Sequence, residues 1–148
     1  MVWGCMSARG LGKLNFIDGT VNAQKYQHIL ETSLLPSAQE LFPNEDYIFQ
    51  QDGASCHSAK STKNWFGNNN IKVLSHPASS PDLNVIETVW HKMKQYLRNH
   101  PQRTIFDLRT KLQEIWDNFS PQMCQSLVNT MPLRVQAVVK AKGDVTPY

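Results

Sequence analysis

The chain has 148 residues and a net charge of +3, with 41% hydrophobic and 18% charged residues. This composition is that of a globular protein rather than a disordered one, and the length suits one domain with a real core. Mean hydropathy is −0.43, and no apolar run approaches the ~20 residues of a membrane span, so we expect no membrane association. We expect no secretory signal from the first residues, and the three widely spaced cysteines suggest neither a disulfide framework nor a zinc pair.

Charge is distributed unevenly along the chain. Residues 1–74 contain six basic and six acidic side chains, whereas residues 75–148 contain nine basic and six acidic ones. The positive excess therefore lies in the second half. This is compatible with nucleic acid binding, although the signal is weak by itself.

The first half has the pattern of alternating strands and helices. Two strands are predicted at residues 2–6 and 13–17, joined by a glycine-containing turn at residues 10–12. Asn22 is a good N-cap for a helix over residues 23–42, in which Pro36 can produce a break or a kink. We then expect a strand at 47–51, a helix at 58–66 ended by Gly67, and a strand at 71–74.

A polar loop at residues 75–79 leads to the clearest helix. Ser80 is expected to cap it, with Pro81 at its first position and Asp82 at the positive end of its dipole. Apolar residues then recur at spacings of three and four, which predicts a core stripe formed by Leu83, Ile86, Trp90, Met93 and Leu97.

The remaining sequence predicts further helices. Thr104 is expected to cap the next one, with Asp107 three residues later, and a last helix starts at residues 120–121. Pro132 is expected to bend or interrupt that helix, and Gly143 to end it. The order β-β-α-β-α-β followed by helices predicts an α/β layered domain with a mixed sheet.

Two carboxylates have positions suited to chemistry. Asp52 follows a predicted inner strand, where ligand sites of α/β sheets gather, and Glu87 lies on the helix predicted to start at Ser80, about two turns from that cap. If the two converge, they can hold a divalent cation such as Mg²⁺, which prefers oxygen ligands. Spacing alone favours the simpler interpretation that Asp52 caps a turn and Glu87 is a solvated helix residue.

The local motifs are more specific. Residues 49–57, FQQDGASCH, resemble the second catalytic Asp motif of the mariner-like superfamily of transposases, and residues 79–87, SSPDLNVIE, resemble its catalytic Glu motif. The 34 residues between Asp52 and Glu87 match the spacing of the worm-type branch. Residues 2–5 are similar to the second strand of that family, and residues 131–134 and 143–148 to its closing signature.

This resemblance implies a ribonuclease-H-like α/β fold, a mixed sheet with flanking helices, in which the first strand is missing. It implies metal-dependent cleavage and transfer of DNA strands, with Asp52 and Glu87 as catalytic metal ligands and Mg²⁺, or Mn²⁺ in its place, as cofactor. The implied partners are double-stranded DNA at transposon ends and targets and, in a longer parent protein, a second copy of the chain. Nuclear localisation is expected from that substrate.

The family uses three carboxylates, and the first lies on a strand upstream of Met1. We therefore expect residues 1–148 to be a single, N-terminally truncated, integrase-like catalytic domain that cleaves no DNA alone. Asp18, after the second strand, is not expected to replace the missing carboxylate. The alternative is a domesticated DNA-binding or interaction protein without catalysis; a nuclease acting on RNA–DNA hybrids is a more distant possibility that the Glu87 motif disfavours.

Several other residues allow two interpretations. His57 is expected to be structural rather than a phosphate or metal ligand, and Cys56 a packed residue rather than a nucleophile. Asn84 can bond near the site or orient its helix. The tryptophans Trp3, Trp65, Trp90 and Trp116 are expected in the core, and the basic residues Lys92, Lys94, Arg98 and Arg103 either contact DNA phosphates or form a solvated face.

Overall fold

The protein is described by a computed structural model that covers residues 1–77, 79–144 and 146–148. These residues form two compact units. The first unit contains Met1–Cys5 and Gly12–Ser80, and the second contains Met6–Leu11 and Pro81–Tyr148. The single domain expected over residues 1–148 stays a prediction. Ala78 in the predicted loop and Val145 in the closing signature lie outside the described residues.

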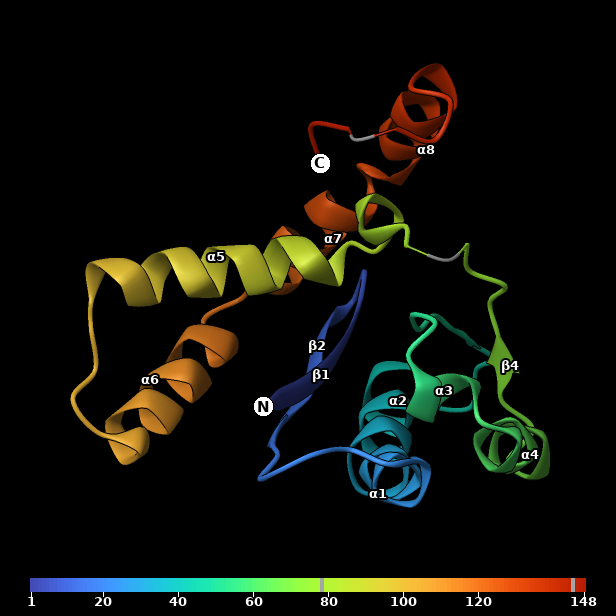
Figure 1. The fold of residues 1–148 in the computed structure, drawn as a ribbon, viewed down its shortest axis with the longest axis horizontal. Coiled ribbons are helices and arrows are strands. Elements are labelled where there is room, and N and C mark those ends of the chain that lie inside the picture. The colour runs from blue at the N-terminus through green and yellow to red at the C-terminus, as the bar shows by residue number, and fades with distance from the viewer. Residues whose placement is uncertain (78, 145) are drawn as a thin grey trace. The chain divides into compact units, whose positions relative to one another are not determined.

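Strands β1 (Val2–Ser7) and β2 (Gly10–Phe16) form a two-stranded sheet (Figure 1). Their turn lies at residues 8–9, so the predicted glycine turn at residues 10–12 is wrong. Gly10 and Gly12 lie inside β2 instead.

Gly12 shows why a glycine is needed in β2. A Cβ at this position would lie 2.5 Å from Sγ of Cys5 and 2.6 Å from Cβ of Ser37. The backbone N–H of Lys13 donates to Oγ of Ser37 at 2.9 Å, and Nδ2 of Asn15 donates to Oγ of Ser33 at 3.0 Å. Glycine therefore lets β2 approach the helix that carries these two serines.

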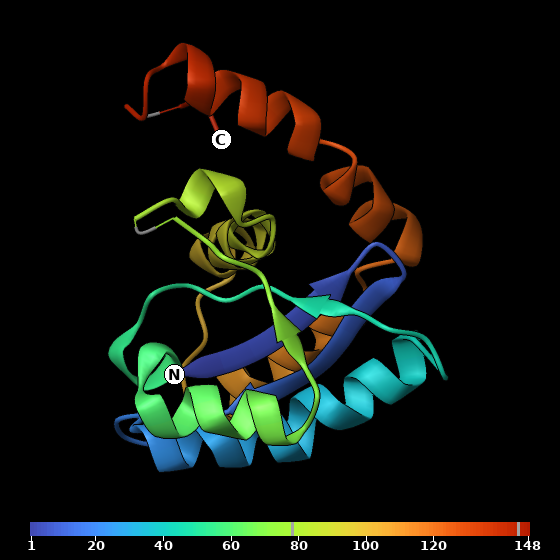
Figure 2. The same ribbon diagram turned by 90° about the vertical axis from the view of Figure 1, so that its right-hand side faces the viewer.

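The predicted helix over residues 23–42 is a continuous helical run of three parts: α1 (Ala23–Ile29), a π-helical turn η1 (Leu30–Leu34) and α2 (Leu35–Leu41). Figure 2 shows the run in blue to cyan. Asn22 caps it as predicted, since its side chain accepts the N–H of Lys25. Pro36 does not end the helix; in the π-helical turn just before it, the N–H of Leu35 bonds to the carbonyl of Leu30, five residues earlier. A widened turn just before a proline keeps its ring clear of the preceding carbonyls.

The rest of the first unit follows the predicted order with shifted boundaries. Strand β3 (Ile48–Phe49) pairs in parallel with β4 (Lys72–Val73), with Ile48 opposite Lys72 and Phe49 opposite Val73. Between them lie α3 (Ser55–Ser58) and α4 (Lys60–Asn68). Gly67 lies inside α4 and does not end it, which corrects the prediction; the helix runs to a cap at Asn69.

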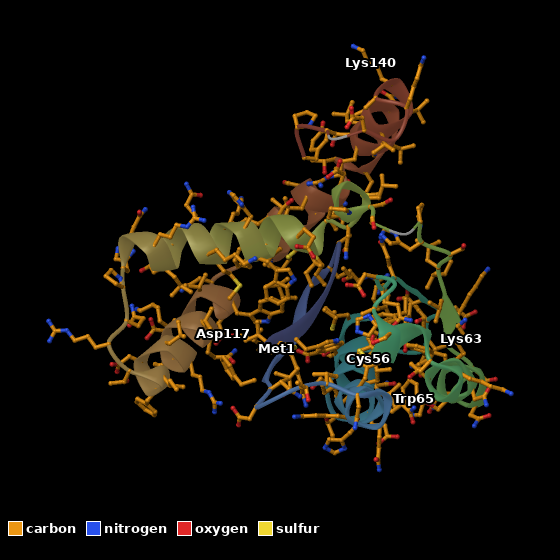
Figure 3. All side chains as sticks on the ribbon, viewed as in Figure 1. Met1, Cys56, Lys63, Trp65, Asp117 and Lys140 are labelled. Carbon is orange, nitrogen blue, oxygen red and sulfur yellow. The ribbon has the colours of Figure 1, made fainter. Side chains whose placement is uncertain are left out.

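A hydrophobic core holds the first unit together. Tyr26, Leu30, Leu34 and Phe66 form its buried centre, and Phe49 and Val73 from the parallel strands pack against it. Cys56 and Trp65, labelled in Figure 3, reach the same core from α3 and α4. Both residues are therefore packing residues, as expected.

The second unit is mainly helical. It contains a 3₁₀ turn η2 (Pro81–Leu83), α5 (Ile86–Asn99), α6 (Ile105–Asp117), α7 (Pro121–Val128) and α8 (Met131–Lys140). The Thr104 cap is confirmed, because its hydroxyl accepts the N–H of Asp107 at 3.0 Å. The last helix ends at Lys140, three residues before the predicted Gly143; Gly143, with a φ of 87°, follows the helix end and its N–H bonds to the carbonyl of Val138.

The core of the second unit lies on α5, α6 and α7. Met93 and Trp116 are buried as predicted, and Trp90 stacks on Trp116 with ring centroids 5.2 Å apart. Val89 and Cys124 are also fully buried, although Val89 was not in the predicted stripe. The predicted positions Ile86, Trp90 and Leu97 are partly buried, so Val89 widens the predicted stripe on its own side.

The pattern of helices and small sheets is that of an α/β protein. Within the described residues the strands pair as two separate two-stranded sheets, β1 with β2 and β3 with β4, rather than as one continuous ladder. The short parallel pair β3–β4 leads directly into the turn that carries Asp52.

Candidate functional site

Asp52 lies in the turn that follows β3. Its Oδ1 accepts the backbone N–H of Ala54 at 3.0 Å and lies 2.6 Å from Nδ1 of His57. The side chain is 61% exposed. Because both contacts engage Oδ1, Oδ2 is the oxygen through which Asp52 would bind a cation. Asp52 therefore does shape a turn, but it also presents a carboxylate oxygen to solvent.

The His57 ring is held in place beside Asp52. It packs on Tyr26, with ring centroids 4.0 Å apart, and its side chain is 18% exposed. The Tyr26 hydroxyl donates to Oε1 of Gln51 at 2.7 Å, and Nε2 of Gln51 donates to the carbonyl oxygen of His57 at 3.3 Å. The three side chains thus fix the Asp52 turn to the core.

Burial also acts on the Tyr26 hydroxyl. The pKa of Tyr26 is raised well above its usual value, mainly by burial and further by the negative charges that Cys56 and Asp52 can carry nearby. The hydroxyl therefore stays protonated at neutral pH and donates to Gln51.

A cavity of about 530 Å³ borders the Asp52 turn within the first unit. Its wall includes Asp52, His57 and Lys63 together with apolar side chains such as Phe66. His76 also lines the cavity, and its Nδ1 lies 3.1 Å from Nε2 of Gln50. The carboxylate therefore borders a space that is lined by both cationic and apolar groups.

Glu87 lies in the second unit, in the first turn of α5. The predicted cap at Ser80 is wrong: residues 81–83 form the separate turn η2, and α5 begins at Ile86 after Val85, whose side chain forms no capping bond. The N–H of Glu87 donates to the carbonyl of Asn84 at 3.1 Å. Glu87 is therefore at the positive end of the helix dipole rather than two turns along it.

The two candidate carboxylates belong to different units, Asp52 to the first and Glu87 to the second. A shared cation between them stays a prediction. Each is exposed, and within the described ranges no group of three His, Cys, Asp or Glu side chains forms a metal cluster. Each exposed carboxylate offers oxygen ligands of the kind that Mg²⁺ prefers.

Four basic side chains of the second unit were expected either to contact DNA or to form a solvated face. The side chains of Lys92, Lys94, Arg98 and Arg103 are exposed, which fits both DNA contact and a solvated face.

Arg134 is 3% exposed, and sequence reasoning placed it only within a closing signature. A basic residue on an otherwise apolar helix face was the signal that could have indicated its buried role.

Comparison with known proteins gives a family. The family model described as DDE superfamily endonuclease matches residues 1–109, a range that contains both Asp52 and Glu87. Two curated relatives match along the entire chain. The Tcb1 transposase of Caenorhabditis briggsae is 34% identical over 148 residues, and the Tc1 transposase of Caenorhabditis elegans is 30% identical over 148 residues. The chain spans about half the length of these relatives, 54% of each.

Solved structures give the same fold. The catalytic domain of Mos1 transposase, solved with raltegravir and Mg, matches with a TM-score of 0.87 at 24% identity, over 97% of this chain and 74% of that one. The Mos1 paired-end complex with the left transposon end matches with a TM-score of 0.87, over 98% of this chain and 43% of that one. These matches confirm the predicted ribonuclease-H-like α/β fold. The chain is a member of the DDE superfamily of endonucleases.

Proposed function

We propose that this chain is the catalytic part of a cut-and-paste DNA transposase, which cleaves and transfers DNA strands in a metal-dependent reaction. The observation that carries the proposal is the family match over residues 1–109, which contains the two motif carboxylates. The similarity to the worm transposases over the entire chain supports it.

In this proposal, Asp52 and Glu87 bind Mg²⁺ or Mn²⁺ through exposed carboxylate oxygens. A bound divalent cation supplies charge stabilisation and an activated oxygen nucleophile at a phosphodiester. The chain's own residues position these ligands: His57 and the N–H of Ala54 hold one oxygen of Asp52, and the start of α5 holds Glu87. Structures of Mos1 transposase with Mg and with Mn support a divalent cation.

The proposed substrate is double-stranded DNA, at transposon ends and at target sites. Complexes of Mos1 transposase with transposon ends support this assignment. The exposed basic side chains of α5 and the loop after it, including Lys92, Lys94 and Arg98, are suited to sequence-independent phosphate contacts. We further propose that the full-length protein acts in the nucleus as a homodimer.

The function is tested on the 148-residue chain and on the longest reading frame that contains it. With supercoiled plasmid and Mg²⁺ or Mn²⁺, the longer protein should nick DNA, and Asp52→Asn or Glu87→Gln should lower the rate at least a hundredfold, because a lost ligand misplaces the cation. The short chain alone should not nick. Equal nicking by the wild type and both variants would contradict the proposed role of these carboxylates.

Reading the DNA upstream of codon 1 separates the two candidate functions. An in-frame strand ending in Asp, preceded by helix-turn-helix coding and an inverted repeat, would support a transposase. Unrelated host exons with a preserved frame would favour a domesticated DNA-binding protein instead.

A further inference from the structure

Arg134 of α8 is a buried cation whose contacts all lie within the second unit. Its Nε donates to Oγ1 of Thr130 at 2.8 Å, its Nη1 to the backbone carbonyl of Asp82 at 3.0 Å, and its Nη2 to Oγ1 of Thr88 at 2.8 Å. The ring of Tyr148 lies over the guanidinium, 4.8 Å from its carbon. A buried charge held by neutral oxygens and an aromatic ring requires all of these contacts to offset its desolvation.

The guanidinium bridges the two sides of the segment that contains Glu87. Asp82 lies in η2, five residues before Glu87, and Thr88 lies in α5, directly after it. Helix α8 and η2 contact each other, at the yellow-green turn that precedes α5 in Figure 1. A planar group with several fixed donors can join both oxygens at once, which the single ammonium of a lysine cannot do in the same geometry.

The end of the chain holds the same turn from a second direction. The Thr146 hydroxyl donates to Oδ2 of Asp82 at 2.6 Å, and the N–H of Tyr148 donates to Oγ1 of Thr146 at 3.4 Å. Asp82 is therefore bound through its carbonyl by Arg134 and through its carboxylate by Thr146. Residues of the closing signature account for both bonds.

We propose that Arg134, together with Thr146 and Tyr148, is a positioning group that fixes η2 and the first turn of α5, and thereby the direction of the Glu87 carboxylate. The catalytic consequence rests on the proposed function, because it requires Glu87 to be a metal ligand. We call these three residues and their contacts to Asp82 and Thr88 the clasp. The clasp does not require Glu87 to be a metal ligand.

The clasp is tested by amide hydrogen exchange on the full chain. The amides of Asn84, Glu87 and Thr88 report on the turn, since they bond to the carbonyls of Pro81, Asn84 and Val85. Thr146→Val removes the hydroxyl that bonds to Asp82 and Tyr148, with little change in volume. It should speed the exchange of these amides about threefold to tenfold, and Arg134→Lys should speed it more than tenfold. Thr110→Val, at an exposed position of α6, is the matched control and should leave them unchanged.

The pattern of exchange separates positioning from general stability. Unchanged exchange at residues 84–88 in both variants would overturn the proposal. Equal acceleration at the Leu108 amide in α6, which bonds to the Thr104 carbonyl, would also overturn it, because that result indicates a general loss of packing.

A second measurement addresses the consequence for Glu87. The affinity of the chain for Mn²⁺ can be measured from the electron paramagnetic resonance signal of the free ion. This affinity should fall at least threefold in Thr146→Val and at least tenfold in Glu87→Gln. If Glu87→Gln binds Mn²⁺ as tightly as the wild type does, Glu87 is not a metal ligand and the proposed metal site is refuted. The hydrogen-exchange result still tests the clasp independently. If Glu87→Gln weakens binding and Thr146→Val does not, the positioning role is overturned.

Discussion

Replacing Tyr26 with phenylalanine removes a single oxygen atom from the centre of the first unit. The Tyr26 side chain is 1% exposed, and its hydroxyl donates to Oε1 of Gln51 at 2.7 Å. Loss of a hydrogen bond costs about 1 kcal/mol, and leaving the half-buried acceptor without its donor adds up to about 1 kcal/mol. The free energy of unfolding should therefore fall by about 1–2 kcal/mol, with the aromatic packing retained.

The same substitution should loosen the Asp52 turn. Gln51 links Tyr26 to the His57 carbonyl, and the His57 side chain lies against Asp52. When Gln51 loses its partner, the amide of Ala54, which bonds to Oδ1 of Asp52, should exchange with solvent several times faster. Urea unfolding followed by circular dichroism measures the stability, and hydrogen exchange measures the turn.

Tyr47 provides the matched control for this experiment. It is half-buried and stacks on Phe42 with ring centroids 5.9 Å apart, so Tyr47→Phe should change the stability by less than about 0.5 kcal/mol. If Tyr26→Phe costs no more than Tyr47→Phe and leaves exchange at Ala54 unaltered, the network does not anchor Asp52.

Three further predictions concern packing and pH. Gly12→Ala should cost at least about 2 kcal/mol in urea unfolding, because its Cβ would overlap Sγ of Cys5; wild-type stability would show that β2 can move away. Trp116→Ala should cost about 3–5 kcal/mol and abolish exchange protection in α6, since the side chain is 3% exposed; retained protection would contradict this. Burial raises the pKa of the Cys5 thiol from 9.0 to about 11, so between these pH values the unfolded chain releases a proton that the folded one keeps. Stability should fall there by up to about 1.4 kcal/mol per pH unit, and an equally steep fall in Cys5→Ala would refute that cause.

The sequence predicts best where one local interaction decides the structure. Asn22 and Thr104 cap their helices as expected, because the side chain of each accepts a backbone N–H three residues later. Trp116 is buried as its spacing indicates. The motifs likewise predict the family, whose model matches residues 1–109, while the metal-binding roles of Asp52 and Glu87 stay predictions.

Predictions fail where distant parts of the chain decide the local structure. The start of α5 could not be read from Ser80, because η2 is held by Arg134 and Thr146, more than fifty residues away in the sequence. Gly12 resembled a turn residue, but its role is to permit contact with Ser37 on α2. The anchoring of Asp52 by Tyr26 and Gln51 could not be predicted either, because these two residues are 25 positions apart in the sequence.

We propose that Asp52 and Glu87 bind one cation. Fe²⁺ with ascorbate and peroxide, used in place of Mg²⁺, produces radicals that cut a polypeptide next to the bound ion, and mass spectrometry locates the cuts. The proposal predicts cuts near both residues, suppressed by excess Mg²⁺ and lost at both places in either Asp52→Asn or Glu87→Gln. Cutting near only one residue, or cutting near one that survives substitution of the other, would contradict a shared site.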